Sequence, residues 1–356
     1  MATQTEIQFS RGFGSDNHAP VHPKIMEALS RCNHNHAPSY GTDLHTQECN
    51  EVLKSFFGPQ TESFFVFNGT GANVAALQTM VRSFETVVST DVAHINVDEC
   101  AAPEITGKVK IIPVPNVNGK LTPNEIRKTI IRRGDQHFAQ VRAISITQPT
   151  ELGTLYSLQE IRGLVQVARE NDLLVHMDGA RFANACAALK VTPREMTTDL
   201  GIDILTFGGT KNSLMFGEVV VIINPKLQKN FSYIRKQICQ LPSKSRYFAA
   251  QFLAYFKDGL WLEIAEHSLQ MARRLAENVH NIPGVQVSYP VESNVVFAKI
   301  PKPWVKPVRK KYFFYVWDEA EVMCRWMTSW DTQTEEISGL TAALKDLSAK
   351  ESCSTP

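Results

Sequence analysis

The sequence predicts an α/β protein with a mostly parallel sheet, followed by a smaller α+β domain. Three observations predict this class. Short β-rich runs alternate with helix-like runs between residues 60 and 225, which is the pattern of βαβ units. After about residue 245 a long helical region leads into short strands of antiparallel type. The chain has 356 residues, enough for two domains with a sizeable core.

These observations predict a large domain over residues 15–250 and a small C-terminal domain over 251–356, on which residues 1–14 pack. The large domain is expected to contain seven strands, at residues 63–67, 85–89, 108–114, 141–147, 172–177, 202–207 and 217–223. Between strands, "TPNEIRKTIIRR" and "SLQEIRGLVQVARE" have helical periodicity, with Thr122 and Ser157 as N-caps. The predicted strands of the small domain are "GVQVSY", "NVVFAKI" and "KYFFYV".

The composition excludes several classes of protein. The chain is 43% hydrophobic and 21% charged, as expected for a globular protein. Its 37 basic and 36 acidic side chains leave a net charge of +1, which gives no reason to expect nucleic acid or an anionic membrane as a partner. The N-terminus "MATQTEIQFSRGFG" lacks the features of a signal peptide, and no stretch approaches the roughly 18 apolar residues of a membrane span. We expect a cytoplasmic protein.

The cysteines and histidines give little support for a disulfide or a metal site. The seven cysteines are scattered, odd in number and without CxxC spacing, which predicts reduced thiols. His18, His22, His34 and His36 cluster near the N-terminus, so a metal site there stays open as a minor alternative. No cysteine or carboxylate stands at ligand spacing with these histidines, and we expect no metal.

A glycine-rich turn follows the first predicted strand, in "FFVFNGTGANVAAL", and a helix is expected to begin near Gly71. Gly69 and Gly71 permit backbone conformations that aim N–H groups at one point, where the helix N-terminus and the Thr70 hydroxyl also attract a phosphate. An isolated GxG is more often an ordinary strand-to-helix turn. The turn lacks both the GxGxxG and the P-loop pattern, so a phosphate bound here would belong to neither NAD nor ATP.

Charged side chains follow two neighbouring predicted strands. Asp178 ends the apolar run in "DLLVHMDGARFANA", and Arg181 comes three residues later. Lys211 follows a strand and two glycines in "ILTFGGTKNSLMFGEVV", an apolar setting that favours imine formation, although a lone lysine is usually a surface charge. The carboxyl ends of parallel strands open on the same crevice, so these three residues and the Gly69–Thr70 turn can face one ligand.

A ligand with a phosphate, an aldehyde for a lysine and a ring nitrogen for a carboxylate is pyridoxal 5′-phosphate (PLP). A carboxylate beside the pyridine nitrogen keeps that nitrogen protonated, so the ring can accept electrons. Asp178 is expected in this position, and Arg181 is placed for a substrate carboxylate. His94, just beyond a strand in "STDVAHINVDECAAPE", can supply a plane over the ring, and the alternative is a partly exposed loop histidine.

With these residues assembled, the chain resembles the low-specificity L-threonine aldolase and phenylserine aldolase family, in the β-eliminating lyase group of fold-type-I PLP enzymes. The resemblance runs through "SDNHAP", "PSYGTD", "NGTGAN", "AHINVDE", "HMDGARFANA" and "TFGGTKN", and thins beyond "SKSRYFAAQ". It implies a large domain like that of aspartate aminotransferase, with a mostly parallel seven-stranded sheet, and a smaller C-terminal α+β domain.

The resemblance also implies roles for individual residues. Lys211 resembles the Schiff-base lysine, Asp178 the partner of the pyridinium nitrogen, and His94 the stacking histidine. The other residues that match functional positions of the family are Gly69 and Thr70 (phosphate), Ser15, Arg181 and Arg325 (substrate carboxylate), Glu99 (near the substrate), Arg246 (a neighbouring subunit's phosphate), and Tyr40 and Asp43 (the dimer contact). Active sites shared in this way imply a homodimer or homotetramer.

One segment departs from the family pattern. Many members carry "ENTH" after the central strand, with its histidine near the substrate hydroxyl, whereas this chain has "TQPTELGT" at residues 147–154. Thr150 or Glu151 would occupy that neighbourhood. The base that takes the β-hydroxyl proton, and the choice between threonine and phenylserine, therefore stay open, as do L versus D stereochemistry and dimer versus tetramer.

The resemblance implies retro-aldol cleavage of L-β-hydroxy-α-amino acids, such as L-threonine, L-allo-threonine and L-phenylserine, to glycine and an aldehyde. One alternative is another PLP activity on the same fold, namely an aminotransferase, a racemase or a β-lyase. A second alternative is a non-catalytic PLP carrier or regulatory module, against which the presence of Lys211, Asp178 and two carboxylate-binding arginines argues. A Rossmann dehydrogenase is disfavoured because the glycine-rich turn has the wrong pattern.

Overall fold

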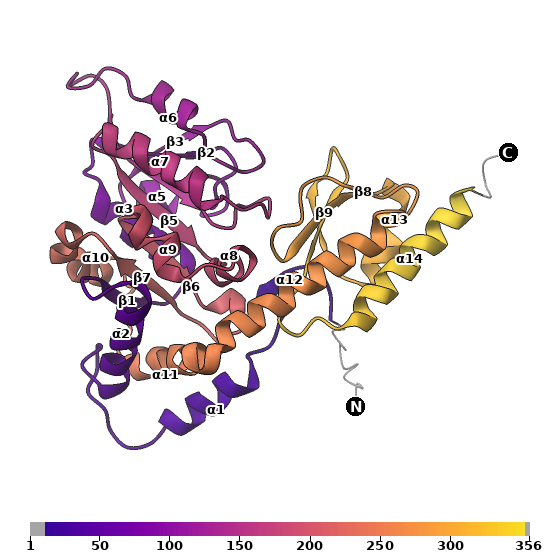
Figure 1. Cartoon of the computed structure of the whole chain (residues 1–356), viewed down its shortest axis with the longest axis horizontal. Helices are drawn as coiled ribbons and strands as arrows, with labels where there is room; N and C mark the ends of the chain where they lie inside the picture. Colours follow the sequence, from indigo (N-terminus) through magenta and orange to yellow (C-terminus); the bar gives the residue numbers. More distant parts are fainter. Residues whose placement is uncertain (1–10, 353–356) are drawn as a thin grey trace, which may run out of the picture. The chain divides into compact units, whose positions relative to one another are not determined.

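The computed structural model describes residues 11–352, which form two compact units (Figure 1). One unit spans residues 20–266, and the other consists of the described parts of residues 1–19 and 267–356. The predicted domain boundary at residue 250 falls inside helix α11 (Ser245–Phe256), whereas the units divide within α12 (Leu260–Val279). Helix α11 stays in the larger unit because it packs against α1 (Pro23–Cys32) and α2 (Leu44–Phe57). Of the N-terminal segment predicted to pack on the small domain, residues 1–10 lie outside the described residues.

A seven-stranded sheet forms the centre of the larger unit, in the order β1-β7-β6-β5-β4-β2-β3. Its strands are β1 (Glu62–Val66), β2 (Glu85–Thr90), β3 (Lys110–Val114), β4 (Gln140–Thr147), β5 (Leu174–Gly179), β6 (Ile204–Gly208) and β7 (Glu218–Ile222). Strand β7 runs antiparallel to both β1 and β6, and the other pairs are parallel. All seven predicted strands and the mostly parallel sheet are therefore confirmed.

Helices flank this sheet and give it two covered faces (Figure 1). Strands β5, β6 and β7 are buried along their whole length, as expected for central strands covered on both faces. Helix α3 (Gly69–Met80) packs against these three strands. The other helices of this unit are α4 (His94–Val97), α5 (Ala102–Ile105), α6 (Pro123–Thr129), α7 (Leu158–Glu170), α8 (Phe182–Leu189), α9 (Pro193–Met196) and α10 (Phe231–Gln237).

The two predicted helix N-caps are confirmed. The Thr122 side chain accepts a hydrogen bond from the Glu125 N–H at the start of α6. Ser157 and Glu160 form a reciprocal capping box at the start of α7, in which each side chain accepts from the other residue's backbone N–H. Such caps satisfy N–H groups that have no partner within the helix, and they fix where each helix begins.

The smaller unit contains an antiparallel four-stranded sheet in the order β10-β11-β9-β8. Its elements are β8 (Gln286–Val287), β9 (Val295–Lys299), α13 (Lys302–Lys311), β10 (Tyr315–Asp318), β11 (Met323–Met327) and α14 (Thr334–Ser352). Its core includes Phe13, Trp304 and Trp326. The three predicted strands are present, but β11 was not predicted, and it carries Arg325. This arrangement confirms the α+β character of the smaller unit.

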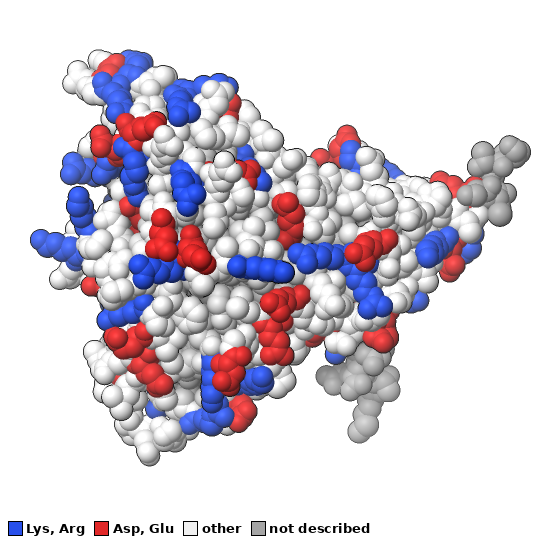
Figure 2. Space-filling model, viewed as in Figure 1, with Lys and Arg blue, Asp and Glu red and all other residues white. Residues whose placement is uncertain are grey.

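The described residues contain no helix long and apolar enough to cross a membrane. On the face shown in Figure 2, basic and acidic side chains are interspersed. Within residues 11–352 the cysteines are free thiols, at positions 32, 49, 100, 186, 239 and 324, while Cys353 lies outside them. No group of three or more His, Cys, Asp or Glu side chains in this part of the chain is placed to hold a metal ion.

Candidate active site

Three polar residues lie side by side at the carboxyl ends of parallel strands in the larger unit. Asp178 at the end of β5 is in register with Thr147 of β4 on one side and with Thr206 of β6 on the other. Asp178 and Thr206 are buried. A buried carboxylate requires hydrogen bonds, and the Oδ1 atom of Asp178 accepts one from the Ala180 N–H at 2.9 Å. The sheet therefore fixes the position of Asp178 within a polar row.

Asn73, from helix α3, ties this row to the rest of the site. Its Nδ2 atom donates to Asp178 Oδ2 and to Glu99 Oε1, each at 2.8 Å. Its Oδ1 atom accepts a hydrogen bond from the Thr206 hydroxyl at 2.9 Å. Both N–H bonds and the oxygen of this buried amide therefore form hydrogen bonds. In this way one side chain holds two carboxylates in fixed positions.

Glu99 joins His94 to the same network. Its Oε1 atom lies 2.9 Å from Nδ1 of His94, and the Glu99 side chain is fully buried while that of His94 is 38% exposed. This hydrogen bond raises the pKa of His94, and burial raises the pKa of Glu99. The imidazole therefore has a fixed orientation and an accessible surface, as a ring that stacks on a planar ligand needs.

Lys211 lies in a short 3-10 turn, Thr210–Asn212, directly after β6, and it is partly buried. On one side of the turn, Glu218 Oε2 accepts a hydrogen bond from the Gly209 N–H at 2.6 Å. On the other side, Asn212 Nδ2 donates to the Trp261 carbonyl at 3.1 Å. The Glu99 hydrogen bond raises the pKa of His94 and burial raises the pKa of Glu218, and the positive charge of Lys211 opposes both increases. The lysine therefore belongs to the same electrostatic environment.

The predicted phosphate turn differs in detail from the expectation. Helix α3 begins at Gly69, two residues before Gly71, with Asn68 as its N-cap; the Asn68 side chain accepts from the Gly71 N–H at 2.8 Å. Neither glycine has a positive φ, so what these glycines contribute is the absence of a side chain and not an unusual backbone conformation. A Cβ on Gly71 would come within 2.2 Å of the Gln240 side chain, whereas a Cβ on Gly69 would meet nothing within 4 Å among the described residues. Gly69 and Thr70 thus begin a twelve-residue helix beside open space, the setting in which helix N-termini bind anions.

Arg181 and Arg246 also lie in the larger unit. Arg181 is the N-cap residue of α8, three residues after Asp178. Arg246, in α11, donates from Nη1 to the carbonyls of His34 and Asn35 at 3.0 and 2.9 Å. Within one chain Arg246 therefore supports the turn after α1, and its role toward a neighbouring subunit stays a prediction.

Tyr40 and Asp43, predicted at a dimer contact, lie just before α2. Tyr40 is 52% exposed and has a φ of 60°, which is unusual for a bulky residue. Asp43 is buried and caps α2, accepting hydrogen bonds from the Thr46 N–H at 2.9 Å and the Thr46 hydroxyl at 2.7 Å. Asp43 therefore has a structural function within one chain, and the dimer contact stays a prediction.

Ser15 and Arg325 belong to the smaller unit, where the fold brings their neighbourhoods together. Arg325 Nη2 donates to the Gly14 carbonyl at 3.1 Å, and its guanidinium lies over the ring of Trp317 at 5.0 Å. Ser15 caps a 3-10 turn by accepting a hydrogen bond from the Asn17 N–H. Their predicted function at a substrate carboxylate stays a prediction.

Comparison with known proteins identifies the family. Residues 12–301 match the beta-eliminating lyase family. This chain belongs to that family. It is 38% identical to a low-specificity L-threonine aldolase of a Pseudomonas species, over 94% of this chain and 97% of that protein. It is also 38% identical to the low-specificity L-threonine aldolase of Pseudomonas aeruginosa, over 91% and 94% of the two chains.

A solved structure supports the same relationship. The threonine aldolase of Leishmania major superposes on this chain with a TM-score of 0.90 at 28% identity, covering 95% of this chain and all of that one. The fold predicted by resemblance, a fold-type-I large domain with a smaller α+β part, is confirmed by this similarity and by the sheet order of this beta-eliminating lyase family member.

Sequence reasoning missed several residues of the network. Asn73 stands inside "NGTGAN", but no pattern shows that its side chain faces Asp178. Thr206 immediately precedes "FGGTKN", and Glu218 follows it as the first residue of β7. A polar residue in an otherwise apolar buried strand was the available signal for Thr206 and Glu218, since such residues usually have a specific partner.

Proposed function

We propose that this family member is a PLP-dependent aldolase that cleaves L-β-hydroxy-α-amino acids to glycine and an aldehyde. The substrates that we propose are L-threonine, L-allo-threonine and L-phenylserine. The 38% identity to two proteins named low-specificity L-threonine aldolase, each over more than nine-tenths of this chain, supports this activity.

The observation that carries the proposal is the network from Asp178 through Asn73 and Glu99 to His94. It supplies a buried carboxylate at a strand end and an oriented imidazole with an accessible surface, in the electrostatic environment of Lys211. A planar ring that carries a protonated nitrogen and an aldehyde matches these three groups: the carboxylate of Asp178, the imidazole of His94 and the amine of Lys211. The helix N-terminus at Gly69 adds a place for a phosphate. The donor set therefore fits PLP.

Each residue has a separate function toward the cofactor. Asp178 would pair with the ring nitrogen, His94 would cover one face of the ring, and Lys211 would hold the aldehyde carbon. Gly69 and Thr70 would bind the phosphate through N–H and hydroxyl donors. When bound, PLP supplies an electron sink for the pair of electrons released at the α-carbon. Asn73 and Glu99 act as positioning residues, because they hold Asp178 and His94 in place.

Arg181 would bind the carboxylate of the substrate by a bidentate, charge-assisted hydrogen bond. Its place as N-cap of α8, three residues beyond Asp178, supports this function. Fixing the carboxylate sets which bond at the α-carbon lies perpendicular to the cofactor ring. This orientation of the substrate then favours cleavage between Cα and Cβ.

We also propose a cytoplasmic homodimer or homotetramer whose active sites are completed across the subunit interface. Tyr40, which is 52% exposed, and the Arg246 guanidinium on α11 are the residues proposed at the shared boundary. Light scattering on a size-exclusion column measures the mass of the assembly. A monomer of 39.9 kDa would contradict this part of the proposal.

The decisive experiment combines a spectrum and a product assay. The purified protein with added PLP is expected to show a visible-to-near-ultraviolet absorption band that the Lys211→Ala variant lacks. Acetaldehyde from L-threonine, or benzaldehyde from L-phenylserine, is then measured with a coupled dehydrogenase. Aldehyde release together with glycine supports the aldolase. A cofactor band without aldehyde release would indicate an aminotransferase, a racemase or a β-lyase instead. The absence of any band would contradict the PLP site.

A further inference from the structure

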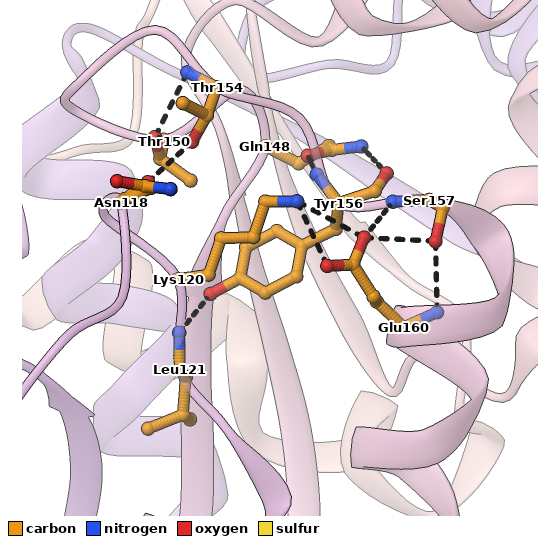
Figure 3. A network of polar contacts seen from close by, with 9 residues as sticks. All are labelled: Asn118, Lys120, Leu121, Gln148, Thr150, Thr154, Tyr156, Ser157 and Glu160. Carbon is orange, nitrogen blue, oxygen red and sulfur yellow. Dashed lines mark hydrogen bonds and ion pairs between the residues drawn. The ribbon is translucent and has the colours of Figure 1, made fainter. Parts of the chain in front are cut away.

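The loop that follows β4, residues 148–156, holds two candidates for the group that meets the substrate hydroxyl. Thr150 is buried, and its Oγ1 atom lies 2.8 Å from the hydroxyl of Thr154 and accepts the Thr154 N–H at 3.2 Å. Thr154 in turn donates to the Asn118 carbonyl at 2.6 Å (Figure 3). The Thr150 hydroxyl is therefore hydrogen-bonded within its own loop.

Glu151 instead contacts the residues of the candidate active site. Its Oε1 atom accepts hydrogen bonds from the His94 N–H at 2.9 Å and from the Thr147 hydroxyl at 2.7 Å. Thr147 is the strand neighbour of Asp178. The second oxygen, Oε2, is buried and has no hydrogen-bond partner among the described residues. A buried carboxylate oxygen without a partner is unusual and energetically costly, and for a carboxylate that also contacts His94 and Thr147 a catalytic function is one physical reason for it.

Two further sets of bonds hold this loop in one conformation (Figure 3). The Gln148 side chain accepts from the Tyr156 N–H at 3.0 Å and donates to the Tyr156 carbonyl at 2.9 Å, which joins the two ends of the loop. The Tyr156 hydroxyl accepts from the Leu121 N–H at 2.5 Å, and Tyr156 is almost completely buried. A loop closed at both ends holds Glu151 with the precision that a catalytic group requires.

We propose that Glu151 accepts the proton of the substrate's β-hydroxyl group, a role that rests on the proposed aldolase function. The O–H bond breaks and its proton moves to the carboxylate. The Cβ–O bond becomes the C=O bond of the aldehyde, and the Cα–Cβ bond breaks with its electron pair left on Cα. Protonation of Cα completes glycine, and release of the proton from Glu151 restores the carboxylate.

The charge environment suits a base that works near neutral pH. Burial raises the pKa of Glu151 to about 7, while hydrogen bonds from His94 and Thr147 act in the opposite direction. The negative charge of Asp178 raises it further. A base is most effective when its pKa lies near the working pH.

The test separates C–C cleavage from chemistry that needs no hydroxyl group. Glu151→Gln and wild-type protein are compared in three measurements: PLP binding by absorbance titration, exchange of the glycine α-proton in D2O by NMR, and aldehyde release from L-threonine. The variant is expected to bind PLP and exchange glycine within about threefold of wild type, and to release aldehyde at least about 100-fold more slowly. Glu151→Asp is expected to recover part of the cleavage.

The matched control is Glu104→Gln, which changes another glutamate whose Oε2 atom is buried without a hydrogen bond in the described structure. It is expected to keep all three activities. Cleavage by Glu151→Gln at the wild-type rate would overturn the proposal, and so would equal losses of PLP binding, glycine exchange and cleavage, because these indicate a structural role. Wild-type protein that binds PLP but cleaves no hydroxy amino acid would instead contradict the aldolase function itself.

Discussion

Oε1 of Glu99 lies 2.9 Å from Nδ1 of His94, so a fully buried carboxylate holds an imidazole whose side chain is 38% exposed. The contact raises the pKa of His94 above its ordinary value of 6.5. It therefore links the protonation of a ring that we assign to the cofactor face with a buried carboxylate next to it.

The Glu99→Gln variant is expected to lower the pKa of His94, because the neutral amide no longer favours the imidazolium. NMR titration of the His94 ring protons, assigned by comparison with a His94→Asn variant, measures the change. A raised histidine pKa stabilises the folded protein fully below the unfolded pKa, and this contribution is lost as pH rises through the folded pKa. Asp98→Asn, at an exposed neighbouring residue, is the control and should leave the pKa of His94 unchanged.

Asn73→Ala is expected to lower the free energy of unfolding by about 3 kcal/mol, because two buried carboxylates each lose a hydrogen bond. Urea denaturation of the apo-protein measures this. The affinity for PLP should fall as well, since Asp178 loses the bond to its Oδ2 atom. Gln78→Ala, on the same helix, is expected to change stability by no more than about 1 kcal/mol. Equal effects of the two variants would contradict the role given to Asn73.

Much of the fold could be predicted from the sequence, because the strands of the larger unit are short apolar runs that alternate with helical segments. The positions of Asp178 and Lys211 could be predicted too, since Asp178 lies at the end of one such run and Lys211 lies shortly after another, while their functions stay predictions. Strand β11 was missed because its pairing partners, β9 and β10, are what make "MCRWM" a strand. Asn73 was missed for a similar reason: its direction depends on how α3 packs on the sheet. Long-range packing of this kind leaves little local pattern.

Glu218→Gln is expected to change the pH dependence of stability. Burial raises the pKa of Glu218 to about 7, so the folded protein favours the neutral carboxyl group. The resulting stability is complete below the unfolded pKa of 4.5 and is lost as pH rises through about 7, by a total of about 3 kcal/mol. The variant lacks this loss, so its stability relative to wild type should increase between pH 5 and pH 8. Glu170→Gln, at an exposed position, should show no such increase.

Tyr156→Phe is expected to destabilise the protein by about 1–3 kcal/mol, because the buried Leu121 N–H loses its acceptor. Aldehyde release should fall as well, since Tyr156 closes the loop that presents Glu151. Thermal denaturation and the cleavage assay measure the two effects. Tyr233→Phe, at a 72% exposed tyrosine, is the control and is expected to stay within about 0.5 kcal/mol of wild type. Unchanged stability and rate in Tyr156→Phe would show that the loop does not depend on this bond.

Whether Lys211 holds the cofactor is tested most directly by borohydride reduction of the protein with PLP, followed by trypsin digestion and mass spectrometry. Reduction makes the link between lysine and cofactor permanent and blocks cleavage at that lysine. We predict a modified peptide spanning residues 195–226, with Lys211 as the modified residue, and no such peptide from Lys211→Ala. Modification of other lysines alone, or of none, would contradict the assignment of Lys211 and the active site built around it.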